Sequence, residues 1–397
     1  MNLYLQFGWG MMDHCRELVP EMPQTTVILS PRDLSENQIV KLAGDIHALG
    51  GTTVLDPQLF DPRSDRLKLT SHAYWPQQYS TADAKLHDVL QDLWELNQKA
   101  MAKQFILPGL YCDRINNLYL NWQEDIMDMA QSQTHNAPRL GTLCLSAETI
   151  HFREQLELLL SRTDTWPVDG YYVIAEPPNG DYLVDNPSWL SNLLMFCVGL
   201  KLQNKKVILG YSNHQMLCMA CAGIDAIASG TYMNVRSFTL DKFFEPDPDD
   251  RKRKKTWYYC PQALTEVTPE FLDVAFQRGV LKSLAPLPEY HSDYADFLFS
   301  GAIPTTTAYD EPLSFRHYLT CLYHQCQHVS LPSFKDRINY QRKMLSEARK
   351  MIGFMHKYGI RGQKRDFEDC IDVNLSALDT FEAERGFLLN RTPALFC

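Results

Sequence analysis

The feature that most constrains the fold of this chain is a series of eight short apolar segments separated by polar turns and helical patterns. The segments are rich in β-branched and aromatic residues, which is typical of strands. They occupy residues 3–7, 25–29, 52–55, 104–107, 141–145, 169–175, 206–210 and 224–228. Nearly continuous apolar strands that alternate with helices predict a parallel sheet covered on both faces. Eight is also a strand number that closes a small barrel.

We therefore predict an α/β fold, a (β/α)8 TIM barrel, over residues 1–236. An open doubly wound sheet is the alternative, but no Gly-x-Gly-x-x-Gly follows the first segment. A barrel needs only about 250 residues, so the rest of the chain must be additional. We predict an irregular loop insertion after the eighth strand, within residues 237–312, and C-terminal helices packing on the barrel over 313–397.

Composition places the chain among soluble globular proteins, with 45% hydrophobic residues and a formal net charge of −10. No apolar run reaches the roughly 18 residues that would span a bilayer, so no membrane partner is expected. The first residues lack a basic segment before the apolar one, which argues against a signal peptide. Eleven cysteines without a framework spacing predict free thiols in a reducing cytoplasm.

Basic residues are nevertheless concentrated in two regions of this acidic chain. Residues 335–365 contain ten Lys and Arg against two acids, and residues 251–255 are all basic. Such patches can hold a polyanion locally, so DNA is the expected partner and RNA the alternative; a solvated loop is the other interpretation of 251–255. The residues predicted to contact the nucleic-acid backbone are Arg236, Arg251, Lys252, Arg253, Lys254, Lys255, Arg342 and Lys343.

Two acids at strand ends are the predicted catalytic residues. Asp56 ends the third strand and precedes Pro57, where a partly desolvated carboxylate would suit a nucleophile or a base that positions water. Glu176 ends the sixth strand in Ala-Glu-Pro-Pro, whose prolines stiffen the backbone. Together they could form the acid/base pair used to cleave glycosidic bonds. The alternative for Asp56 is a turn cap.

Aromatic and polar side chains near the same strand ends are candidates for binding a planar base. Aromatic residues would stack on it, although they also commonly fill barrels, and amides or hydroxyls would contact its edge. The candidates are Trp9, Gln58, Tyr111, Ser146, Tyr211, Asn213 and Asn234.

A cysteine–histidine cluster near residue 324 raises the question of zinc. On one helix Cys321, His324 and His328 would share a face, but four tetrahedral ligands cannot come from one uninterrupted helix. A partial zinc site completed by Cys260 is the alternative to our main expectation, which is that the protein needs no cofactor.

Several segments resemble the tRNA-guanine transglycosylase superfamily. The resemblance rests on VDGYYVIAEPP (168–178), on KKVILGYSNHQMLCMACAGIDAIASGTYMNVRSF (205–238), on the helical pattern over 315–352 and on VLDPQLF (54–60). The sequence departs from the family after the eighth strand, where Ser229-Gly230-Thr231 replaces its Asp-Cys-Val motif, and it lacks the family's zinc-ligand spacing.

The resemblance implies glycosidic-bond chemistry on a nucleic-acid base. Because the second acid of the family is missing, we expect hydrolysis of the N-glycosidic bond of a modified base in DNA, as in relatives that act against phage. Asp56 would stabilise the sugar cation or align water, while Glu176 and Asn213 would hold the departing base. The alternatives are exchange of a 7-deazaguanine base, a non-catalytic nucleic-acid-binding barrel, and a barrel enzyme acting on a small molecule.

Overall fold

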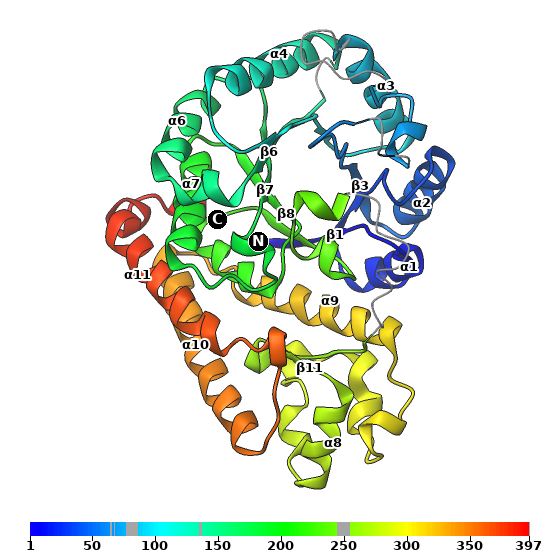
Figure 1. The fold of residues 1–397 in the computed structure, drawn as a ribbon, viewed down its shortest axis with the longest axis vertical. Helices are drawn as coiled ribbons and strands as arrows, with labels where there is room; N and C mark the ends of the chain where they lie inside the picture. The colour runs from blue at the N-terminus through cyan, green and yellow to red at the C-terminus, as the bar shows by residue number, and fades with distance from the viewer. Residues whose placement is uncertain (64–65, 67, 77–85, 135–136, 244–254, 397) are drawn as a thin grey trace.

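The computed structural model describes residues 1–63, 66, 68–76, 86–134, 137–243 and 255–396. A curled sheet with helices around it forms the upper part of the molecule in Figure 1, and a smaller lobe lies below it. The lobe contains a two-stranded sheet and α8, and two long C-terminal helices run along one side of the molecule. The fold is thus mixed α/β, as the sequence predicts.

The large sheet is parallel throughout and has the order β3-β2-β1-β9-β8-β7-β6-β4, with β5 paired to β6. Each of the eight predicted segments overlaps a strand. The short β5, which pairs with the carboxyl half of β6, was not predicted. The strands are β1 (Asn2–Gln6), β2 (Thr26–Leu29), β3 (Thr52–Leu55), β4 (Phe105–Ile106), β5 (Tyr111–Cys112), β6 (Arg139–Leu145), β7 (Gly170–Ala175), β8 (Lys206–Gly210) and β9 (Ala226–Ser229).

Alternate side chains of the strands pack into two separate cores, one on each face of the sheet. One set packs outward against the helices. The other fills the concave side, where strands far apart in the sheet order meet through their side chains. The concave core includes Tyr4, Ile28, Val54, Ile106, Leu140, Cys144, Tyr172, Ile174, Ile208, Ala226 and Ala228.

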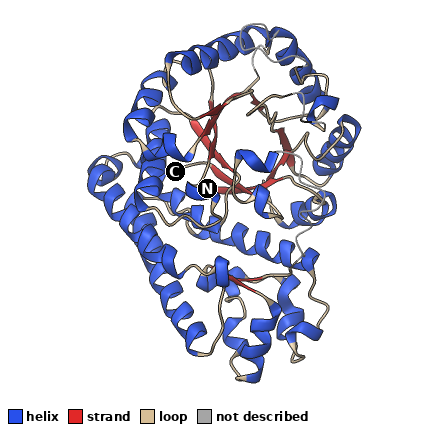
Figure 2. Cartoon of the chain, in the orientation of Figure 1, coloured by secondary structure: helices blue, strands red, loops and turns tan. Residues whose placement is uncertain are grey.

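The two ends of the sheet approach each other at β3 and β4, where Lys103 N donates a hydrogen bond to Thr53 O (2.8 Å). The pairing of strands does not continue across this junction in the part of the chain that the structure describes. Figure 2 shows the resulting curled sheet. The eight predicted parallel strands are confirmed, whereas a continuous closed ladder is not observed.

Helices surround the convex face, and the loops after the strands lead into most of them. In the first half of the chain they are α1 (Met12–Glu21), α2 (Glu36–Ala48), α3 (Leu86–Lys99), α4 (Asn117–Gln133), α5 (Ala147–His151), α6 (Arg153–Thr163) and α7 (Pro187–Leu202). The segment after β8 (His214–Ala222) is a 3-10 helix of 9 residues and not an α-helix.

The segment after β9 is more regular than predicted. An antiparallel hairpin, β10 (Tyr258–Cys260) and β11 (Thr265–Val267), and helix α8 (Pro269–Gln277) follow. The predicted helical stretch 313–357 is two helices, α9 (Glu311–His328) and α10 (Phe334–Lys357), and α11 (Glu368–Leu389) completes the chain. Helix α9 packs beside β1 and α11 packs beside α7. No helix in the described ranges has the length and apolar character needed to cross a bilayer.

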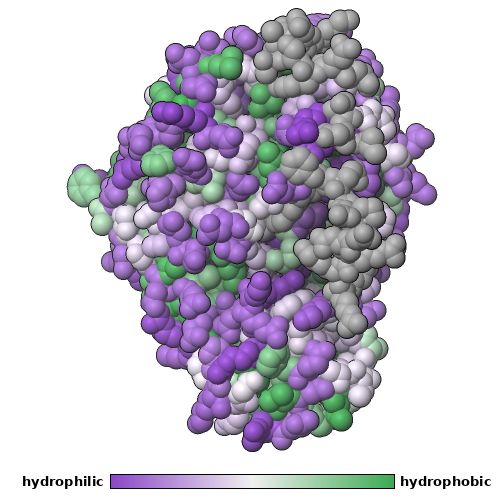
Figure 3. Space-filling view, in the orientation of Figure 1, coloured by the Kyte–Doolittle hydropathy of each residue, from purple (hydrophilic) through white to green (hydrophobic). Residues whose placement is uncertain are grey.

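The face seen in Figure 3 is mostly hydrophilic, and its hydrophobic residues form small separate patches over the described part. Isolated exposed apolar side chains are normal on soluble proteins. On the described part of this face no large apolar patch marks a binding site, whereas the carboxyl ends of the strands carry the polar residues predicted to bind a base.

Candidate functional site at the carboxyl ends of the strands

Asp56 lies directly after β3 and is completely buried. Its Oδ2 accepts hydrogen bonds from the hydroxyls of Tyr211 (2.8 Å) and Tyr172 (3.2 Å), and Oδ1 accepts from Gln58 N (3.0 Å). Tyr172 belongs to β7 and Tyr211 follows β8, so the hydrogen bonds to Asp56 cross the concave side of the curled sheet. Sequence analysis identified Asp56 and Tyr211 but missed Tyr172.

The donors to Asp56 are held by an unusual backbone. Gln58 (φ 55°) and Tyr211 (φ 51°) both adopt the left-handed conformation, which costs a residue with a side chain roughly 1–2 kcal/mol. The Gln58 amide also joins the two regions, because its Nε2 lies 3.0 Å from Ser30 Oγ and 3.3 Å from the Tyr211 hydroxyl. Strain that gathers around one buried group is a common property of functional sites.

Burial raises the pKa of Asp56 to about 6, and the hydrogen bonds from Tyr211, Gln58 and Tyr172 oppose that shift only in part. These three partners are all neutral. A carboxyl group removed from water without a cation beside it favours its protonated form. Asp56 therefore changes charge near neutral pH, which suits a general base or a carboxylate that stabilises a developing cation.

Aromatic rings cover Asp56 at the carboxyl end of the sheet. Phe60, Phe238, Phe243 and Tyr211 pack edge to face or tilted, with centroid distances between 5.2 and 6.4 Å. The guanidinium of Arg32 lies 5.1 Å from the centroid of the Phe243 ring. Asp56 is 0% exposed and its donor Tyr211 belongs to this cluster, so a substrate could reach the carboxyl group only if side chains around it moved.

Glu176 occupies a separate position after β7 and is half-buried. The Tyr111 hydroxyl donates a short hydrogen bond to Oε2, and Leu240 N lies 3.4 Å from Oε1. Asp56 and Glu176 have no hydrogen-bond partner in common among the described residues. Glu176 therefore holds the Tyr111 hydroxyl in place. An acid/base pair of Glu176 with Asp56 stays a prediction.

The other predicted base contacts are placed differently. Ser146 caps α5 by accepting from Thr149 N (3.0 Å), and Asn213 caps the 3-10 segment after β8 while donating to Tyr182 O (2.6 Å). Both side chains therefore already have hydrogen-bond partners within the protein. Asn234 is half-exposed in a 3-10 turn, and Trp9 is 63% exposed in the turn after β1, away from the Asp56 network.

Arg236 is not positioned for the predicted contact with a nucleic-acid backbone. Its side chain is 2% exposed and donates to Gly230 O (2.9 Å) and to Glu266 (3.2 Å). Glu266, in β11, also binds Arg365 (2.7 Å) and the Tyr182 hydroxyl (2.9 Å). This buried network, which sequence analysis missed, joins the hairpin to the sheet.

The predicted basic patches are described only in part. Residues 251–254, which include Arg251, Lys252, Arg253 and Lys254, lie outside the described residues, and Lys255 is exposed. Arg342 lies between Asp379 (2.6 Å) and Glu382 (2.7 Å) of α11. Lys343 is mostly exposed and lies 3.8 Å from Glu347. Acids of α11 therefore neutralise part of the basic stretch.

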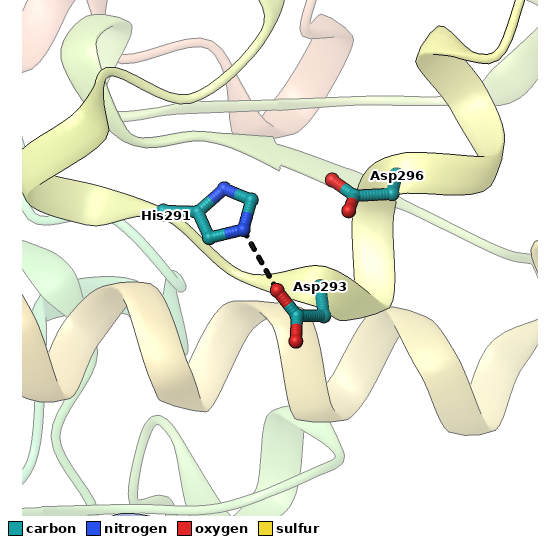
Figure 4. Close-up of side chains that lie close together, drawn as sticks. All are labelled: His291, Asp293 and Asp296. Atoms are coloured by element: carbon teal, nitrogen blue, oxygen red, sulfur yellow. Dashed lines mark hydrogen bonds and ion pairs between the residues drawn. The ribbon is translucent and has the colours of Figure 1, made fainter.

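The cysteine and histidines considered for zinc do not come together. Cys321 is buried, burial raises the pKa of its thiol well above the usual value, and His328 is exposed. In the described part of the chain, the one group with metal-ligand geometry is instead His291, Asp293 and Asp296 (Figure 4). His291 Nε2 lies 2.7 Å from Asp293 Oδ1. All three side chains are exposed, as acidic groups without a metal commonly are, so they identify no cofactor.

Comparison with known proteins does not identify a family. No protein-family model matches the sequence, and no curated protein matches it. Among solved structures, a glucosidase from Croceicoccus marinus is similar over 59% of this chain and 58% of its own, with 10% identity and a TM-score of 0.34. The metallated homocysteine methyltransferase MmuM from Escherichia coli is similar over 61% of this chain and 94% of its own, with 12% identity and a TM-score of 0.31.

Proposed function

We propose that this protein is a glycosylase that hydrolyses the N-glycosidic bond of a modified base in DNA, with Asp56 as its catalytic carboxylate. The observation that carries the proposal is the state of Asp56: it is fully buried, its partners are neutral, and its pKa is about 6. Cleavage of a glycosidic bond passes through a cation-like sugar that a nearby carboxylate stabilises. A carboxylate in a dry site does this more strongly than one in water.

The cover over Asp56 supplies surfaces suited to a base. When a flipped base enters, it would take the place of one or more of Phe60, Phe238 and Phe243 and stack on those that remain. Base flipping costs a few kcal/mol, which such stacking offsets. For this reaction we further propose that the curled sheet is a (β/α)8 barrel, completed where Lys103 N bonds to Thr53 O.

As the C–N bond breaks, its electron pair would leave with the base, and the ionised Asp56 would stabilise the sugar cation. Water would then attack the anomeric carbon and give a proton to Asp56, and the released base would take up a proton in turn. The Tyr211 and Tyr172 hydroxyls would hold the carboxylate in place. Glu176 would act through Tyr111, whose ring packs 6.4 Å from that of Phe238. Glu176 is then a positioning residue.

The test is release of free base from DNA of phages with modified and unmodified bases, followed by mass spectrometry. The wild-type protein should release a modified base, and Asp56→Asn should slow release at least about 100-fold. Asp128→Asn, an exposed change on α4, is the matched control and should leave the rate unchanged. Absence of any released base from all these DNAs would remove the proposal.

A non-catalytic nucleic-acid-binding barrel is a second candidate, and the complete cover over Asp56 favours it. It predicts that DNA binds and that Asp56→Asn keeps full biological activity. Incorporation of a labelled 7-deazaguanine in place of an abasic site would instead indicate base exchange.

A further inference from the structure

A cavity lies at the carboxyl end of the sheet, near the Asp56 site. It has a volume of about 430 Å³ and is formed by β5, the following turn and the start of α4. Small-molecule sites are usually 300–1,000 Å³ and have aromatic walls with a few polar groups. This cavity therefore has the size of a site for one ring-bearing molecule.

The walls of the cavity are aromatic. Tyr111, Tyr119 and Trp122 line it, and Leu118 at its edge is 72% exposed. Trp122 is nine-tenths buried, and its indole N–H has no hydrogen-bond partner in the described part of the protein. The indole nitrogen itself is buried, so the cavity offers a ligand the aromatic ring surfaces of its walls. A planar ring would cover these surfaces.

The charged side chains around the cavity indicate which kind of ring-bearing ligand it would bind. Asp113, Asp125 and Arg114 line it, all three exposed. Two carboxylates against one guanidinium make a net acidic lining, which favours a ligand that presents hydrogen-bond donors. Carboxylates recognise the amino group of cytosine by accepting from it. An amino-bearing ring fits this lining better than a ring that presents carbonyl oxygens in the same place.

The cavity is connected to Asp56 through packed rings. Tyr111 lines the cavity and packs on Phe238 (6.4 Å between centroids), which packs on Tyr211 (5.4 Å), the donor to Asp56. A ring in the cavity is therefore separated from Asp56 by aromatic side chains. In the proposed reaction such a ring would lie next to the base at Asp56, with Tyr111 between the two positions.

We propose that this cavity is a subsite for an amino-bearing heteroaromatic ring, and that in the proposed reaction it selects the nucleobase next to the one removed. The second part rests on the proposed function, whereas the ring site stands on the cavity itself. Contacts to flanking nucleotides are a known source of sequence preference in enzymes that flip bases.

Calorimetric titration with deoxycytidine and deoxyuridine tests the ring site. The two nucleosides share sugar and ring size, but cytosine has an amino group at C4 and an unprotonated N3, whereas uracil has a carbonyl oxygen at C4 and an N3–H. Deoxycytidine should bind about ten-fold more tightly to the wild-type protein. Asp113→Asn and Asp125→Asn together should remove the preference. Both positions are exposed, so the fold should persist. Asp128→Asn, also exposed on α4 but outside the cavity, should keep it. Equal affinities, or a preference unchanged in the double variant, would overturn the proposal.

Base release from oligonucleotides with cytosine or uracil beside the modified base tests the second part. Faster release next to cytosine, lost in the double variant, is the expected result. If deoxycytidine is preferred but no DNA loses a base, the ring site stands and the proposed function fails. If base is released at equal rates and the nucleosides bind equally, the glycosylase stands and the subsite is overturned.

Discussion

Asp56 and Glu266 are both completely or almost completely buried carboxyl groups, yet their environments have opposite effects. Asp56 has neutral hydrogen-bond partners, and burial raises its pKa to about 6. Glu266 is equally desolvated, but Arg365 and Arg236 bring the pKa of its carboxyl group down to about 2. Burial alone therefore does not decide the charge of a carboxyl group; its charged neighbours do. Glu266 is therefore ionised at neutral pH and structural, whereas the pKa of Asp56 lets it change charge near pH 6.

The largest expected effect is on stability, from breaking the Glu266 network. Glu266→Gln leaves the buried Arg236 and the partly buried Arg365 without a carboxylate, which should lower the free energy of unfolding by about 3–5 kcal/mol. Because the folded-state pKa of Glu266 lies below 4.5, its contribution is present above pH 4.5 and is lost as the pH falls toward 2. Urea unfolding between pH 3 and 8 measures this difference. The exposed Glu289→Gln is the control, and a loss below 1 kcal/mol would mean that the network is not structural.

Asp56→Asn should have the opposite effect on stability. The folded-state pKa of Asp56 lies above 3.8, so its favourable contribution is complete below about pH 4 and is lost as the pH rises through 6. An amide escapes this cost, and at pH 8 the variant should be more stable by up to about 3 kcal/mol. The gain should vanish below about pH 4 in the same urea series. A variant that is less stable than the wild type at pH 8 would show that the carboxylate is satisfied where it lies.

Tyr211→Phe should have a smaller effect, because it removes one of three donors to Asp56. Hydrogen bonds to charged groups contribute about 1.5–3 kcal/mol, so the variant should lose about 2 kcal/mol at pH 8, where Asp56 is ionised. At pH 4 the loss should be smaller, since the carboxyl group is then mostly protonated. Tyr323→Phe, on a partly exposed tyrosine of α9, provides the control. A loss independent of pH would assign Tyr211 a packing role only.

Sequence analysis located the strands well because each is a short apolar run, and it located Asp56 because parallel strands place their last residues at one edge. Tyr172 could not be identified in this way, because its hydroxyl reaches Asp56 from β7, which is five positions from β3 in the sheet order. A tyrosine inside a buried strand looks like core. The one sequence signal was a polar side chain inside another buried strand: Gln6 of β1, whose Oε1 lies 2.9 Å from the Tyr172 hydroxyl.

The ion pairs of Glu266 and those of the basic stretch 335–365 could not be predicted from the sequence, for the same reason. Glu266 pairs with residues 30 and 99 positions away, and Arg342 pairs with acids of another helix. Such pairs depend on how helices and hairpins dock, which local patterns do not encode. A lone acid in the otherwise uncharged stretch 256–269 was the available signal for Glu266.

The pH dependence of base release in single-turnover reactions tests the role of Asp56 most directly. If the ionised carboxylate of Asp56 drives the reaction, the rate should increase about ten-fold per pH unit below 6 and level off above it. Asp56→Asn should be slow at every pH while remaining folded. A rate that is constant between pH 4.5 and 8, or an Asp56→Asn variant as fast as the wild type, would contradict this role.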